Sequence, residues 1–234
     1  MKILVIACTV LGFSNFAVAA DRLGNSGLNV GITAGAVIGK SALNLTNWEG
    51  DEPGYDTTGT TYKKNDTAGL IGFQVGYKHY LSNGVMVGIE GDWQKTNFDA
   101  NLNDAPYSDA ALGQKVNDLI TLRAKAGKLI QPNTLAYLTA GYAYARGDVK
   151  MHDGTYHTDA DTDKNLGSNG WVAGLGLEHS ISNHVSIKGE YLYTKTHGKA
   201  HTSTNLDNGG DHEDYYSKTT FKADLLKVGV NYNF

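Results

Sequence analysis

Cysteine is almost absent from this chain: Cys8 is the single cysteine among 234 residues. Proline is also scarce, with 3 residues, whereas glycine reaches 29. One cysteine excludes a disulfide framework and a cysteine-based metal site. The low proline content argues against a proline- and glycine-rich linker protein, and the hydrophobic share of 41% argues against a disordered chain.

Long apolar runs are missing beyond the N-terminal segment. A transmembrane helix needs about 20 consecutive apolar residues, and no such uncharged run follows. A helical membrane protein is therefore excluded. A membrane β-barrel is not, because its strands present only every second side chain to lipid. The net charge of −4 gives no indication of a nucleic-acid partner.

Residues 1–20 have the pattern of a secretory signal peptide. One positive charge and a largely apolar stretch precede a small-residue cleavage motif at 17–19. We expect cleavage before Ala20 or Asp21. The remainder, 21–234, is then expected to form one β-barrel domain.

An internal repeat organises the remainder of the chain. Residues 76–90 align with 176–190 and share six identities, and four asparagines recur at intervals of 50: Asn83, Asn133, Asn183 and Asn233. We interpret this as four modules, each with two strands, one short turn and one long polar connection. The expected long connections are 41–65, 99–115, 148–168 and 197–218.

Eight segments with alternating apolar and polar residues are predicted as strands. They are 28–40, 66–80, 85–98, 116–130, 134–147, 169–181, 185–196 and 219–234. Eight such strands with alternating short and long links are typical of an outer-membrane barrel. A soluble ligand-binding barrel of the lipocalin type is the alternative, and it would turn its apolar face inward.

The chemistry of the two faces favours a membrane barrel with the apolar face outward. Aromatic side chains cluster near strand ends, as in interfacial girdles, and the polar face is rich in glycine. The polar face also carries balanced charge, which suits a confined lumen because buried charges need partners. The predicted lumen charges are Lys78, Glu90, Asp92, Arg123, Lys125, Glu178, Lys188, Glu190 and Lys227. The side-chain parity of strand 134–147 is ambiguous.

Several strand motifs resemble the small OmpA-like outer-membrane β-barrel proteins, among them single-domain surface-antigen and hemin-binding proteins. The motifs are Gly-Ile-Glu-Gly-Asp-Trp at 88–93, Leu-Arg-Ala-Lys-Ala-Gly at 122–127, Thr-Ala-Gly-Tyr-Ala-Tyr at 139–144, Gly-Trp-Val-Ala-Gly-Leu-Gly-Leu-Glu at 170–178, Lys-Gly-Glu-Tyr-Leu-Tyr at 188–193 and Val-Gly-Val-Asn-Tyr-Asn-Phe at 228–234. The resemblance implies an all-β, eight-stranded antiparallel transmembrane barrel in the cell outer membrane, with short periplasmic turns and long extracellular loops. It also implies that Phe234 is the insertion signal read by the barrel-insertion machinery.

Two of the predicted long connections are rich in histidine. They contain His152 and His157 in one, and His197, His201 and His212 in the other. Histidine is a ligand for haem iron and, together with carboxylates, for zinc. These five residues are therefore candidate haem or metal ligands, and haem is the sharper choice because the resembled family includes hemin-binding members.

The most direct functional expectation is a non-enzymatic surface protein that contributes to outer-membrane structure. Its expected partners are outer-membrane lipid, lipopolysaccharide and the insertion machinery. A loop-based binder of haem, metal or a host surface is one alternative. A narrow ion-conducting porin is another, although an eight-stranded barrel is only wide enough to be filled by its side chains.

Overall fold

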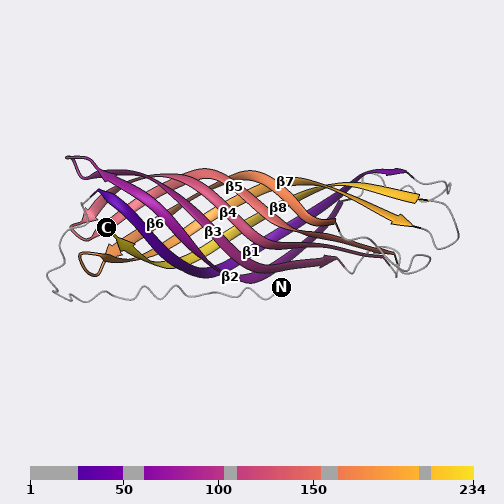
Figure 1. Ribbon diagram of the computed structural model, residues 1–234, viewed down its shortest axis with the longest axis horizontal. Coiled ribbons are helices and arrows are strands. Elements are labelled where there is room, and N and C mark those ends of the chain that lie inside the picture. Colours follow the sequence, from indigo (N-terminus) through magenta and orange to yellow (C-terminus); the bar gives the residue numbers. More distant parts are fainter. Residues whose placement is uncertain (1–25, 50–60, 103–109, 154–162, 206–211) are drawn as a thin grey trace.

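Figure 1 shows the computed structural model of the chain, which describes residues 26–49, 61–102, 110–153, 163–205 and 212–234. They form eight strands: β1 Gly27–Glu49, β2 Thr61–Tyr80, β3 Val85–Leu102, β4 Ala110–Gln131, β5 Thr134–Asp153, β6 Asp163–Ser180, β7 Val185–Asn205 and β8 His212–Asn233. In this part of the chain no helix is long and apolar enough to cross a bilayer. The proposed signal peptide lies outside the described residues.

The strands close into one antiparallel barrel in sequence order. Closure is made by β1 against β8, where Val30 lies opposite Tyr232 and Ala34 opposite Val228. A bilayer offers no water to backbone groups, so a sheet that crosses it must leave no open edge. The structure confirms the predicted fold class and all eight predicted strand cores. Gly84, which has a φ of 76°, provides the left-handed residue in the short turn before β3.

The barrel wall is apolar outside and polar inside over its central part. On β8, Val228 is 66% exposed and Val230 45% exposed, whereas Lys227, directly before Val228, is buried. The structure also shows which side chains of β5 face inward, a point that the sequence left ambiguous: Tyr137 is buried and Leu138 is exposed. Exposed aromatic side chains flank the apolar band at both ends: Phe73, Tyr142, Trp171 and Tyr191 toward the long connections, and Tyr77, Tyr232 and Phe234 toward the short turns.

The strands are longer than predicted at the end that carries the long connections, which we call the loop end. A membrane strand needs about 9–11 residues, yet the shortest strands here have 18 and β1 has 23. Most of the residues expected to form long polar connections continue these strands instead. The prediction of long irregular loops was wrong there because backbone ladders continue beyond the lipid-facing pattern from which the strands were predicted.

Two ladders end early at the loop end and divide the barrel into two groups of four strands. The β2–β3 ladder ends at Leu70 opposite Thr96, and the β6–β7 ladder ends at Asn169 opposite His197. The other six ladders run further, as in β7–β8, which extends to Asn205. At the right of Figure 1 the strands accordingly separate into a β7–β8–β1–β2 group and a β3–β4–β5–β6 group.

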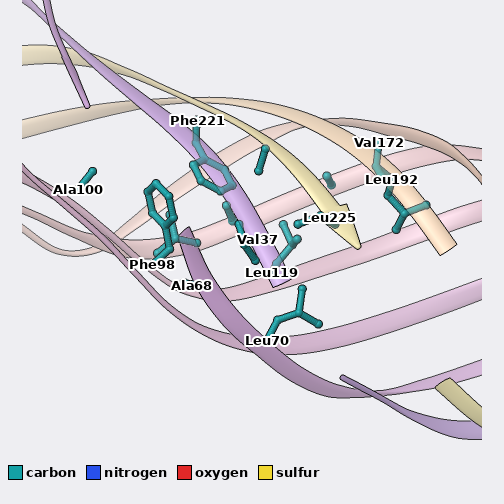
Figure 2. Packing of buried hydrophobic residues seen from close by; sticks show 14 residues of the cluster. Val37, Ala68, Leu70, Phe98, Ala100, Leu119, Val172, Leu192, Phe221 and Leu225 are labelled. Carbon is teal, nitrogen blue, oxygen red and sulfur yellow. The ribbon is translucent and has the colours of Figure 1, made fainter. Parts of the chain in front are cut away.

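An apolar layer packs between these two groups (Figure 2). One half comes from β7, β8, β1 and β2: Val37, Ala68, Leu70, Leu192, Phe221, Ala223 and Leu225. The other half comes from β3, β4, β5 and β6: Phe98, Ala100, Val116, Leu119, Ala143, Ala145 and Val172. The rings of Phe98 and Phe221 meet edge to face with centroids 5.1 Å apart. A Cβ on Gly39 would lie 2.4 Å from Phe98, so this pair requires glycine there.

Phe221→Ala is expected to lower the free energy of unfolding by about 3–5 kcal/mol, because it leaves a cavity in a packed layer. The matched change Phe73→Ala removes an outward ring that is 57% exposed. Detergent or lipid can fill that space, so its cost is expected to be clearly smaller. Urea unfolding of the refolded chain, followed by gel mobility of unboiled samples, measures both. Equal losses would contradict a packed layer inside the barrel.

Candidate functional site in the barrel lumen

Arg123 on β4 stands at the centre of the lumen and is 0% exposed. Its Nη2 lies 2.7 Å from Glu90 Oε1 and 2.7 Å from Asp92 Oδ2, and its Nη1 lies 3.1 Å from Glu190 Oε1. Glu90 and Asp92 alternate on the neighbouring strand β3, where Glu90 is directly opposite Arg123. Glu190 comes from β7, which does not pair with β3 or β4. The guanidinium therefore joins strands that the sheet itself does not link.

Three lysines complete this central cluster. Lys125 Nζ lies 3.0 Å from Glu90, Lys188 Nζ 2.7 Å from Glu90, and Lys227 Nζ 2.8 Å from Asp92. Lys188 and Lys227 also approach Glu190 at 3.2 and 3.4 Å. Four cations thus share three carboxylates, and each carboxylate contacts at least two cations. This sharing is what makes buried charge tolerable, since an unpaired buried ion is very costly.

Two residues of the cluster were not recognised from sequence. The Tyr137 hydroxyl donates to Glu190 Oε1 at 2.8 Å, and the Lys125 ammonium lies 4.0 Å from the centre of its ring. The Thr121 hydroxyl donates to Asp92 Oδ2 at 2.9 Å. Tyr137 was missed because the parity of its strand was ambiguous. Thr121 shares the inward parity of Arg123, but a hydroxyl carries no charge signal.

A second, smaller ion pair lies toward the short turns. Lys78 Nζ is 2.5 Å from Glu178 Oε1, and both side chains are buried. Ser186 Oγ and Asn231 Nδ2 also donate to this oxygen, at 2.5 and 3.2 Å. Lys78 donates further to Asn233 Oδ1 at 3.0 Å. The structure thus brings all nine predicted lumen charges inside the wall, seven in the central cluster and two in this pair.

The lumen therefore contains an ionic cluster and an apolar layer, one after the other along the barrel. The apolar layer was not predicted. Ala100 lies where a polar connection was expected, and the other residues of the layer lie in predicted strands, most of them on the face that was expected to be polar. Chemically, these two layers can brace opposite walls and obstruct the passage of water and ions. In the cluster, each carboxylate and each ammonium group is held in ion pairs.

The histidine prediction can be followed only in part. His197 is exposed on β7, with its Nδ1 3.1 Å from Thr220 Oγ1. His152, His201 and His212 lie on β5, β7 and β8, but their side chains are outside the described part of the structure, as is His157 altogether. Among the described residues no group of three or more potential ligands could hold a metal ion.

Phe234, the predicted insertion signal, ends the chain on the lipid side of the wall. Its side chain is 70% exposed, and its ring meets Tyr232 edge to face with centroids 5.0 Å apart. Its backbone N–H donates to the Leu28 carbonyl at 3.0 Å. The residue therefore belongs to the aromatic band at the short-turn end. Its recognition by insertion machinery stays a prediction.

Because the carboxylates are shared, removing one carboxylate is expected to lower the free energy of unfolding more than removing one lysine does. Glu90→Gln leaves four cations in the central cluster facing two carboxylates, so a loss of about 3–5 kcal/mol in unfolding free energy is expected. Lys125→Met leaves three of each sign, and Glu90 keeps Arg123 and Lys188, so its cost should be smaller. The double variant should be more stable than Glu90→Gln alone. Urea titrations of the four proteins form a double-mutant cycle that measures this coupling, and strict additivity would contradict a shared network.

Several known proteins resemble this chain over most of its length. The 31 kDa outer-membrane immunogenic protein of Brucella melitensis is 28% identical over 256 residues, covering 100% of both chains. The 25 kDa outer-membrane immunogenic protein of Brucella abortus is 28% identical over 152 residues, which is 64% of this chain and 59% of that protein.

Two solved structures are also similar. The outer membrane protein OprG of Pseudomonas aeruginosa gives a TM-score of 0.49 at 13% identity, with 92% of this chain and 99% of that chain covered. The attachment invasion locus protein Ail of Yersinia pestis gives 0.42 at 13% identity, covering 90% and 100%.

A family model for the outer membrane protein beta-barrel domain matches residues 5–234. This range contains every strand of the closed barrel and the whole lumen cluster. The outer-membrane relatives and the apolar outward face give the barrel its location in the outer membrane. The chain therefore belongs to the outer membrane protein β-barrel domain family.

Proposed function

We propose that this outer-membrane barrel is a structural element of the membrane, closed to solutes and braced from within. The observation that supports the proposal most directly is the Arg123 cluster, which connects β3 and β4 to β7 across the lumen at 2.7–3.1 Å. A wall tied through its own interior resists flattening and strand separation. The proposal includes no catalytic step.

The ionic cluster favours a closed lumen over a narrow pore. The interior of an eight-stranded barrel has room for little more than its own side chains. A permeating ion would therefore have to displace Arg123 or one of the lysines from its carboxylates. Separating a buried ion pair costs several kcal/mol because each freed charge is left without solvent.

The apolar layer is a second obstacle in series with the first. A hydrated ion that reached Phe98 and Phe221 would lose water without gaining polar partners, because both rings are buried among apolar side chains. Hydrophobic constrictions of this kind block conduction by excluding water. The ionic cluster and the apolar layer together support a closed lumen more strongly than either layer does alone.

Planar-bilayer recordings test this closure. The refolded chain is expected to give no steady conductance steps above the lipid baseline. The triple variant Arg123→Ala/Phe98→Ala/Phe221→Ala, which cuts into both layers, should conduct if it folds. If it does not fold, Arg123→Ala alone is recorded. Steady, ohmic conductance of the unmodified chain would overturn the proposal and support the porin alternative.

Loop-end binding of haem or a metal ion is the second candidate function, and His197 supports it. Its side chain is exposed, and Thr220 engages Nδ1, so that Nε2 has no hydrogen-bond partner among the described residues. A hydrogen bond at one ring nitrogen orients the other for a ligand. His201 lies four residues further along the same strand, toward the loop end.

A haemin absorbance titration of the refolded chain measures this binding. A saturable Soret shift is expected to weaken at least tenfold in His197→Ala/His201→Ala. The matched control His79→Ala/His184→Ala changes two histidines near the short turns and should leave the titration unchanged. A flat titration of a folded barrel, or equal losses in both variants, would exclude haem binding through these two residues.

A further inference from the structure

A row of three lysines crosses the outer surface of the barrel toward the loop end. Lys195 on β7 lies directly opposite Lys222 on β8, and Lys222 lies directly opposite Lys40 on β1. All three have outward parity; Lys40 and Lys222 are exposed, and Lys195 is partly exposed. Neighbouring strands are about 4.8 Å apart, so three positive charges emerge from the wall within roughly 10 Å.

The positive surface continues beyond this row. Lys199 and Lys218 form another directly opposite pair on β7 and β8, closer to the loop end, and both are exposed. We call these five residues the lysine strip: Lys40, Lys195, Lys199, Lys218 and Lys222. Among the residues whose side chains are described, no carboxylate lies within ion-pair distance of any of the five.

On the other half of the barrel, several charged side chains have partners within the protein. On the β3–β4–β5–β6 group, Arg146 Nη2 lies 2.7 Å from Asp118, and Asn117 Nδ2 donates to Asp148 at 2.9 Å. Charge there is mixed in sign, and Asp118 and Asp148 are both engaged by side chains of the same group. The lysine strip is therefore one-sided, and it lies on the β7–β8–β1–β2 group alone.

Like charges directly opposite each other in a sheet destabilise it. A row of three, with a further pair beyond, is costly unless an external anion lies between the ammonium groups. Lysine ammonium groups bind phosphate as point charges. The row therefore favours a ligand that brings several anionic oxygens to the barrel wall.

The position of the row along the barrel indicates where that ligand comes from. Trp171 on β6 is directly opposite Lys195. Tyr193, two residues from Lys195 toward the membrane centre, packs against Trp171 with ring centroids 5.5 Å apart. In the row of Tyr193, Asp224 is engaged by the Tyr191 hydroxyl at 2.5 Å. Aromatic belts mark the level of lipid headgroups, so the row begins at headgroup depth.

We propose that the lysine strip binds the phosphate groups of anionic lipid headgroups in the outer leaflet, with phosphorylated lipopolysaccharide as the occupant. Long extracellular loops and short periplasmic turns are the rule for such barrels, which puts the strip on the outer leaflet. The lysine stems can lie along the apolar wall while the ammonium groups reach the phosphates. The strip then fixes one side of the barrel to the headgroup layer.

The test titrates lipopolysaccharide into the full chain refolded in a zwitterionic detergent at low salt. Binding is followed by tryptophan fluorescence, because Trp171 lies beside Lys195. Near an anionic surface each lysine contributes about fivefold in affinity. Lys195→Gln/Lys222→Gln is therefore expected to bind roughly 25-fold more weakly. Lys95→Gln/Lys128→Gln removes the same charge from β3 and β4 and should bind as the unmodified chain does.

A second readout is the temperature at which the folded gel band disappears. At the same concentration, lipopolysaccharide should raise this temperature clearly less for Lys195→Gln/Lys222→Gln than for the unmodified chain. Without lipid, that variant should be at least as stable as the unmodified chain, since two like charges have been removed. If it fails to fold, Lys40→Gln, with an expected fivefold loss, replaces it.

Three outcomes would overturn the proposal. Equal affinity of the strip variant and the unmodified chain would show that the strip does not carry the binding. Equal losses in the strip variant and in Lys95→Gln/Lys128→Gln would indicate attraction by net charge only. Equal protection by inorganic phosphate at the same phosphate concentration would show a free-anion site instead of a lipid headgroup site.

Discussion

The buried guanidinium of Arg123 is the interaction on which the barrel depends. Arginine does not lose its proton in proteins, so its charge has to be neutralised where it stands. Glu90 and Asp92 supply that charge from the adjacent strand, and Glu190 supplies it from across the lumen. A register slip of one residue would turn every inward side chain of a strand toward lipid. Charges on the lipid face cost about 2–4 kcal/mol each at mid-bilayer, so the cluster also selects the register of the wall.

Side chains point alternately inward and outward along the whole length of each strand. In the membrane the outward side chains are the apolar ones, whereas at the loop end the inward side chains are. Within the apolar band, Val228 and Val230 face outward while Lys227 faces the lumen. Toward the loop end of the same strand, Phe221 is buried inside and Lys222 is exposed outside. The environment explains the reversal, because the outer face passes from lipid to headgroups and water. Apolar side chains then gain more by packing with each other inside.

This reversal also explains how far the sequence could predict the structure. Strands that face lipid alternate clearly, so their number, their order and the inward charges could be derived from the pattern. The outermost loop-end segments were assigned to polar connections, since an apolar residue such as Leu43 on the inner face carries no membrane signal. Strand β5 has tyrosine on both faces, at Tyr137 and Tyr142, so its sequence did not show which side chains point inward.

The sequence could not predict which charged residues pair with one another, and the reason is a different one. Alternation shows that Arg123 and Glu190 both point inward, but they lie on strands that do not pair. Which acid meets which base depends on the stagger of the strands around the closed barrel. Five positive and four negative inward charges could therefore predict that pairs form, but not that Glu90 is shared by Arg123, Lys125 and Lys188.

The inner and outer lysines differ in where the negative charge that neutralises them comes from. Lys188 and Lys227 point into a space that is closed to solvent and to lipid, so the chain itself has to provide their carboxylates. Lys222 and Lys195 point outward at the level of the aromatic belt, where the surroundings can provide anions. A carboxylate added beside them would satisfy these charges within the protein and remove the reason to contact a headgroup. Leaving them unpaired preserves an attraction between the wall and an anionic membrane surface, which is the physical basis of the proposed lipid contact.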